Sequence, residues 1–144
     1  MFIISRGQAT VKQVVNQTNL TRQKDEDPLG EEVRNLFDFD MFGEVSMVYG
    51  CKRTCSVVSK NYCTLATISR PDYIELKRNI NLSNFEAQLK KNMCFYDDPL
   101  KLFIEYELNK IEYFRDLSPI TKNDIIFSME QLKHSEGELI TKKG

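Results

Sequence analysis

A short stretch around residue 50 combines residue types that can hold a phosphate group and a sugar. Gly43 permits close approach of the backbone, and a helical turn expected over residues 45–48 leaves N–H groups free to face an anion. Arg53, ten residues after Gly43, offers a planar fork of donors suited to a phosphate or a carboxylate. Glu44 is an acceptor for a sugar hydroxyl, and Thr54 adds a small hydroxyl beside the arginine. Together these residues suit one singly charged phosphate and a ribose.

The same stretch has a simpler interpretation as a turn between two strands that carries an exposed arginine and glutamate. Residue types alone favour this alternative, because short glycine-containing loops with an arginine are common. The chain contains neither a Walker A lysine motif nor a G-x-G-x-x-G motif, so nothing in it indicates nucleoside triphosphate chemistry.

Strands are expected on both sides of this stretch. Residues 2–15 predict a hairpin around a turn at Arg6 and Gly7. The polar residues 16–32 predict a solvated loop between strands. Residues 57–58 and 62–68 predict two further strands separated by a turn.

Helices are expected from residue 69 onwards, where the apolar residues take a helical period. Pro71 marks the start of a short helix that ends near residue 80. Ser83 and Glu86 form an S-x-x-E capping box for a second helix, which extends to Tyr96.

Two later helices have an N-cap residue followed by proline, at Asp98-Pro99 and Ser118-Pro119. The second of them is expected to end near Leu132, and residues 138–141 predict a strand. The helix from Pro99 has an apolar stripe that predicts a buried face. The stripe consists of Leu100, Phe103, Ile104, Leu108 and Ile111.

The composition indicates a globular chain of ordinary domain size, with 144 residues, 41% of them apolar and a net charge of −1. A near-neutral balance argues against nucleic-acid and lipid-surface binding. No apolar run approaches the ~20 residues that span a bilayer, and the first residues do not resemble a signal peptide. These features predict a cytoplasmic location without membrane contact.

The reactive side chains do not form a recognisable catalytic or metal-binding pattern. Without a secretory signal, Cys51, Cys55, Cys63 and Cys94 are expected to be reduced thiols. Their spacing and the single histidine, His134, predict no metal site. No nucleophile and base are arranged as a pair, so we expect no enzymatic activity.

The run from Phe42 to Val57, F-G-E-x-x-x-x-x-G-x-x-R-T-x-S-V, resembles the phosphate-binding cassette of the cyclic nucleotide-binding domain without a gap. That family includes domains of ion channels, of regulatory subunits of cyclic-nucleotide-dependent kinases and of bacterial catabolite-type regulators. Residues 2–11 resemble the preceding strands of its β-roll, and residues 62–76 resemble its last strand and the following helix. The resemblance implies an α+β fold: an antiparallel β-roll, jelly-roll-like and built as a double-stranded β-helix, with C-terminal helices.

The resemblance also implies a ligand, cAMP or cGMP, and no cofactor. The ligand-binding residues that it implies are Gly43, Glu44, Val45, Ser46, Arg53 and Thr54. Arg53 would pair with the cyclic phosphate and Glu44 would accept the ribose 2′-hydroxyl, while the first helical turn would offer backbone N–H groups. Thr54 matches a channel residue that can contact the guanine of cGMP bound in the syn conformation.

The residue that covers the base is expected on the helix over 83–96, and the sequence leaves four candidates. They are Phe85, Leu89, Lys90 and Met93. Helical spacing favours core packing for Leu89 and Met93.

The order of the parts departs from a complete domain of this family. Residues 1–97 resemble its C-terminal part, with β-roll strands, the cassette at 42–57 and the two following helices, B and C, but without the first strands. Residues 98–144 resemble the helical start and first strands of a second such domain, or a permuted completion of the first. We also expect that a homo-oligomer or a domain-swapped dimer can supply the missing strands.

The resulting hypothesis is a cyclic nucleotide sensor module from a larger channel-like or kinase-regulatory-like protein. In a channel it would lie at the cytosolic face of the membrane. The alternative is a structural or interaction domain of the same fold that does not bind nucleotide.

Overall fold

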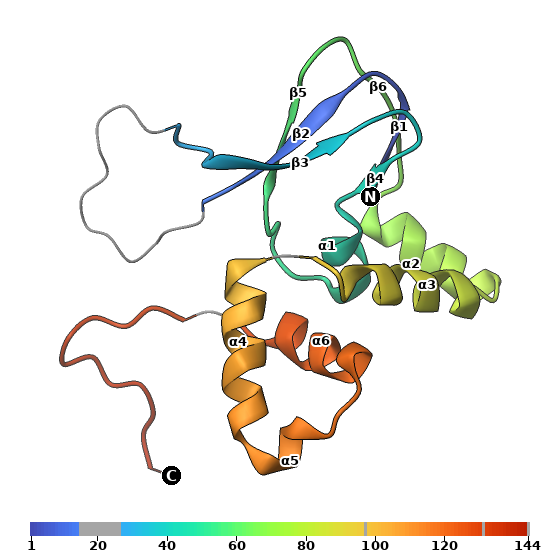
Figure 1. Ribbon diagram of the computed structural model, residues 1–144. Helices are drawn as coiled ribbons and strands as arrows, with labels where there is room; N and C mark the ends of the chain where they lie inside the picture. The colour runs from blue at the N-terminus through green and yellow to red at the C-terminus, as the bar shows by residue number, and fades with distance from the viewer. Residues whose placement is uncertain (15–26, 97, 131, 144) are drawn as a thin grey trace.

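The computed structural model describes residues 1–14, 27–96, 98–130 and 132–143, and places the strands at one end of the molecule and helices α4 to α6 at the other (Figure 1). The strands are β1 (Phe2–Arg6), β2 (Ala9–Gln13), β3 (Glu31–Leu36), β4 (Met41–Phe42), β5 (Ser56–Ser59) and β6 (Thr64–Thr67). The helices are α1 (Glu44–Tyr49), α2 (Arg70–Asn79), α3 (Ser83–Met93), α4 (Pro99–Lys110), α5 (Glu112–Arg115) and α6 (Pro119–Ser128). The α+β class expected from the sequence is confirmed.

The strands form two three-stranded antiparallel sheets, ordered β4-β1-β6 and β3-β2-β5. β1 and β2 are the central strands of different sheets, so the predicted hairpin over residues 2–15 is wrong. Their partners are distant in sequence, with Phe2 opposite Thr67 and Lys12 opposite Ser56. Residues 2–13 therefore run antiparallel to residues 56–67 as one bent ribbon, and the segment 31–42 pairs along its other side.

Gly7 forms the bend where the chain passes from the first sheet to the second. Its φ angle is +118°, and a Cβ atom there would lie 2.4 Å from the carbonyl oxygen of Tyr62. Only glycine fits this close approach of two backbones without strain. The Arg6-Gly7 signal was thus a bend between sheets and not a hairpin turn.

Helices α4 and α6 begin at the residues that the sequence predicts, and α2 begins at Arg70, one residue before the expected start at Pro71. The side chains of Ser69, Asp98 and Ser118 accept hydrogen bonds from the backbone N–H groups of Asp72, Lys101 and Thr121, so each satisfies one otherwise unpaired donor. The capping box at Ser83 is wrong, because α3 begins at Ser83 itself and its N-cap, Leu82, has no side-chain cap bond.

The end of the chain departs from the expected elements. α6 ends at Ser128 instead of near Leu132. The strand expected over residues 138–141 is not formed: residues 138–143 have no regular structure, and Leu139 is 72% exposed. The predicted loop over residues 16–32 lies largely outside the described residues, and its last residues, Glu31 and Glu32, belong to β3.

The core has two parts. The larger one joins α1 to the following helices through Val45, Met47, Tyr73, Leu89 and Met93. The smaller one lies between the sheets and contains Ile4, Ala9 and Leu36. α1 is thereby fixed between the strands and the helical part.

The predicted apolar stripe of α4 is buried at one position. Leu108 is buried, but Leu100, Phe103 and Ile111 are exposed. Among the described residues, no helix is long and apolar enough to cross a membrane.

Candidate functional site

Helix α1 is short because a glycine with a left-handed backbone limits it at each end. Gly43 precedes the helix with φ +75°, and Gly50 follows it with φ +74°. Such angles are costly for any residue with a Cβ atom. Val45 and Met47 pack the helix into the core, which leaves Ser46 facing the first sheet and the loop that carries Arg53.

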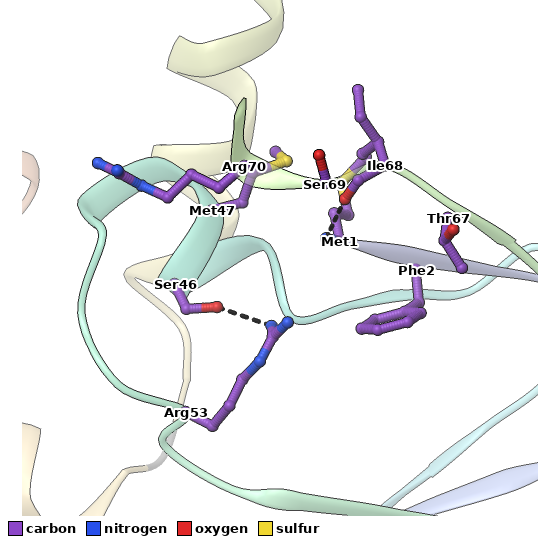
Figure 2. A pocket seen from close by; sticks show the side chains of 9 residues that line it. All are labelled: Met1, Phe2, Ser46, Met47, Arg53, Thr67, Ile68, Ser69 and Arg70. Carbon is purple, nitrogen blue, oxygen red and sulfur yellow. Dashed lines mark hydrogen bonds between the residues drawn. The ribbon is translucent and has the colours of Figure 1, made fainter. Parts of the chain in front are cut away.

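Arg53 is fixed against the start of this helix (Figure 2). Its Nη1 donates to the carbonyl oxygen of Gly43 at 2.9 Å and to Oγ of Ser46 at 2.7 Å. Ser46 Oγ in turn donates to the same carbonyl at 3.2 Å. The guanidinium also lies over the ring of Phe2, 5.5 Å from its centre, and that ring stacks on Phe42. These contacts orient a side chain that is otherwise solvent-exposed.

The guanidinium of Arg53 keeps most of its donors available. Within the described residues it forms no ion pair, and its hydrogen bonds all leave from Nη1. The edge formed by Nε and Nη2 can therefore donate two parallel hydrogen bonds to an anion with two oxygens.

A cavity of about 330 Å³ lies beside Arg53, in the size range of small ligand sites. It is bounded by Phe2 and Thr67 of the first sheet, by α1 and by the start of α2. None of its nine lining residues is acidic, and its charged side chains are Arg53 and Arg70. Arg70 extends away from Arg53 in Figure 2, toward Gly50. The cavity is thus suited to an anionic ligand.

Glu44 faces a different cavity from Arg53. The glutamate is 4% exposed, and it lines a second cavity of about 330 Å³ together with Arg34, Asn92, Phe95 and Tyr96. The Tyr96 hydroxyl donates to Glu44 Oε1. The structure therefore brings Gly43, Ser46 and Arg53 together, and holds the Glu44 carboxylate on another side of α1.

The other predicted binding residues occupy varied positions. Val45 is buried in the core, so its backbone and not its side chain is free for a ligand role. Thr54 is exposed and lines neither cavity. Of the candidates for covering a base, Leu89 and Met93 are buried in the core, as their spacing indicates, and Lys90 pairs with Asp124 at 3.0 Å.

Sequence reasoning missed two residues that act on the predicted site. Phe2 holds the guanidinium of Arg53, and Tyr96 holds the carboxylate of Glu44. Both are far along the chain from their partners, so only strand pairing and helix packing reveal the contacts. A phenylalanine at the start of a strand carries no local signal of such a role.

Metal-binding and disulfide features do not add to this site. Within the described residues no three histidine, cysteine, aspartate or glutamate side chains cluster as a metal site would require. The four cysteines are free thiols. Burial raises the pKa of Cys51 and of Cys55, so both thiols are protonated at neutral pH.

Comparisons with known proteins give one structural likeness. No family model matches the chain, and no curated protein sequence does. Among solved structures, the fold is similar to cAMP-bound PfPKA-R (141–441), with a TM-score of 0.41 and 17% sequence identity. The alignment covers 88% of this chain and 36% of that one, so the chain spans about a third of the length of the structure that it matches.

Proposed function

We propose that this chain is a binding module for a cyclic nucleotide, cAMP or cGMP, and not an enzyme. The observation that carries the proposal is the arrangement of Arg53, whose guanidinium is oriented by Gly43, Ser46 and Phe2 beside a cavity without acidic lining residues. A cyclic phosphate has one negative charge and two free oxygens, which match the two donors on the open edge of one guanidinium.

The cassette resemblance and the structure support the proposal through the same residues. The glycine and the arginine of the F-G-E…R-T run are ten residues apart and contact each other. The carbonyl oxygen of Gly43 accepts a hydrogen bond from Arg53. A turn with a solvated arginine, the simpler interpretation, requires no such contacts.

We further propose that residues 1–97 form the ligand-binding part and that residues 98–144 belong to a second such domain or complete the first. In this account the module senses a nucleotide within a larger regulatory or channel protein, and occupancy is transmitted through the C-terminal helices. Transmission requires that the ligand bind two arrangements of those helices with different affinity.

Titrations with the two cyclic nucleotides and their two nucleosides test the proposal. Isothermal calorimetry should detect binding of cAMP or cGMP, and much weaker binding of adenosine or guanosine, which lack the phosphate that Arg53 is expected to bind. No heat or thermal shift with cAMP or cGMP at millimolar concentration would reject the proposal. That result would favour a structural or interaction domain, for which the separation of Glu44 from the Arg53 cavity is the supporting observation.

A further inference from the structure

The second cavity contains a buried oxygen that no described residue satisfies. Glu44 is 4% exposed, and its Oε1 accepts a hydrogen bond from the Tyr96 hydroxyl. Its Oε2 is buried and has no hydrogen-bond partner among the described residues. Leaving a buried carboxylate oxygen unpaired is costly, and such a group in a native protein requires an explanation. Because Glu44 lines the cavity, a donor on a bound ligand can supply the missing partner.

A guanidinium lies near the same tyrosine hydroxyl. Arg34 of β3 lines the cavity together with Glu44, and neither side chain takes part in an ion pair within the described residues. Burial, followed by the carboxylate of Glu44, raises the pKa of Tyr96, and the nearby guanidinium of Arg34 opposes this rise. Tyr96 is therefore close to both groups. The cavity offers a carboxylate and a guanidinium, not paired with each other, to one small ligand.

Two exposed phenylalanine rings form the apolar part of this cavity. Phe39 and Phe95 line it and are 80% and 76% exposed. Phe39 has φ +71°, a left-handed backbone that is strained for so large a residue. Its N–H donates to the carbonyl of Ile4 at 2.7 Å, and the Asp40 carboxylate closes the turn by accepting from the N–H of Phe37 at 2.8 Å. Backbone strain of this kind is concentrated at ligand sites.

We propose that the second cavity binds a free amino acid with an aromatic side chain. The ammonium group donates to Oε2 of Glu44, and the carboxylate of the ligand accepts from Arg34. The aromatic ring packs against Phe39 and Phe95. A zwitterion suits this cavity because side chains of both charges line it, whereas the cavity beside Arg53 has no acidic lining residue. The site lies apart from the proposed nucleotide site and does not depend on it.

Calorimetric titration of the 144-residue chain with three related compounds tests the charge pattern. The compounds are L-phenylalanine, phenethylamine, which lacks the carboxylate, and 3-phenylpropionate, which lacks the ammonium group. The wild type should bind L-phenylalanine about tenfold or more tightly than either analogue, the value of one hydrogen bond between charged groups. No binding of L-phenylalanine at millimolar concentration, or equal binding of either analogue, would overturn the inference.

Two variants assign the two charged contacts separately. Glu44→Gln should reduce the affinity for L-phenylalanine to that for 3-phenylpropionate, because the ammonium group then has no carboxylate to bind. Arg34→Gln should reduce it to that for phenethylamine. Arg34 is exposed, so this variant keeps the inference testable if Glu44→Gln fails to fold. A folded variant that retains the wild-type preference would overturn the contact assigned to its residue.

Matched control variants remove similar groups outside the cavity. Glu86 also accepts from a tyrosine hydroxyl, that of Tyr73 at 3.1 Å, and Arg6 is an exposed strand arginine like Arg34. Neither control residue lines a described cavity. Glu86→Gln and Arg6→Gln should therefore keep the wild-type preferences. Losses as large as those of the cavity variants would show a general effect of charge and overturn the site.

The outcomes are separable from those of the proposed function. Binding of L-phenylalanine without binding of cAMP or cGMP would support the amino-acid site and reject the nucleotide site. Binding of a cyclic nucleotide without binding of L-phenylalanine would do the reverse.

Discussion

The contact between Gly43 and Arg53 explains why the cassette needs glycine before α1. A Cβ atom at Gly43 would lie 2.4 Å from Arg53 Nη1 and 3.4 Å from the Phe2 ring. Any larger residue would therefore displace the guanidinium from its position over the ring, in addition to straining a backbone with positive φ.

Gly43→Ala should weaken cyclic nucleotide binding at least tenfold, because the guanidinium loses its two hydrogen bonds and its orientation. Gly50→Ala is the control, since Gly50 has nearly the same φ, +74°, and a Cβ there would meet Arg70 instead. Both variants should lose about 1 kcal/mol of stability from backbone strain. Equal losses of affinity in the two variants, measured by calorimetry, would contradict the role assigned to Gly43.

The raised pKa values of three tyrosines lead us to expect a loss of stability at alkaline pH. Burial, followed by the nearby carboxylate of Glu86, raises the pKa of Tyr73 to about 12, and burial likewise raises the pKa of Tyr49 and of Tyr96. Because these folded pKa values lie above the unfolded value of 10.0, the unfolded chain loses its protons first. The stabilisation is complete below pH 10 and is lost as pH rises through the folded values.

Urea unfolding at increasing pH measures this effect. The free energy of unfolding should fall above pH 10, and tyrosinate absorbance should show tyrosines that titrate only as the protein unfolds. The decline should be smaller in Tyr73→Phe. A fall of the same size in that variant would show that other groups cause it.

At the scale of elements, α1 is attached to the helical part by a cluster around Tyr49. The Tyr49 hydroxyl donates to Asp124 of α6 at 2.8 Å, and its ring stacks on Phe127 with centroids 5.0 Å apart. Lys90 of α3 completes the cluster, 3.0 Å from the Asp124 carboxylate and over the Tyr49 ring. A shift of α1 upon ligand binding would act directly on α6.

Tyr49→Phe should loosen α6 more than the strands. We expect a loss of about 1 kcal/mol for the hydrogen bond, with the ring stacking retained. Amide hydrogen exchange should become faster in α6 and stay unchanged in β1 and β2. Faster exchange throughout the molecule would mean that the cluster stabilises the whole fold and does not link two elements.

Elements that are determined by neighbouring residues could be predicted from the sequence, whereas elements that depend on distant residues could not. The starts of α4 and α6 depend on neighbouring residues, Asp98 and Ser118, which the sequence identifies as N-caps, and Pro71 locates the start of α2 to within one residue. The predicted hairpin over residues 2–15 is wrong because β1 pairs with β4 and β6, and β2 pairs with β3 and β5, all of which are distant in the sequence. At the site, the glycine-to-arginine spacing was recognisable, whereas the roles of Phe2 and Tyr96 depend on long-range packing.

At the scale of the whole molecule, much apolar surface is exposed. Large apolar side chains of α4, of α5 and of the turn after α3 are more than 45% exposed, among them Phe95, Leu102, Phe103 and Tyr113. Within the described residues, β3, β4, β5 and β6 each have one unpaired edge. Exposed apolar surface and open strand edges both favour association.

We therefore expect the 144-residue chain to self-associate. Sedimentation at several concentrations should show a dimer or larger species that dissociates on dilution. A monomer that unfolds cooperatively at every concentration would contradict the prediction, and would also argue against the assignment of residues 98–144 to a second, incomplete domain.

The most direct test of the account is the affinity of Arg53→Ala for a fluorescent cyclic nucleotide. Lys52→Ala is the control, because it removes the same charge from the exposed neighbouring position. Loss of a charge-assisted hydrogen-bonded pair costs about 1.5–3 kcal/mol, so Arg53→Ala should weaken binding by roughly 10- to 150-fold. Lys52→Ala should change it by less than about threefold, as expected of a solvent-screened charge. Equal affinity of wild type and Arg53→Ala would contradict the phosphate-binding role of Arg53, on which the proposed function depends.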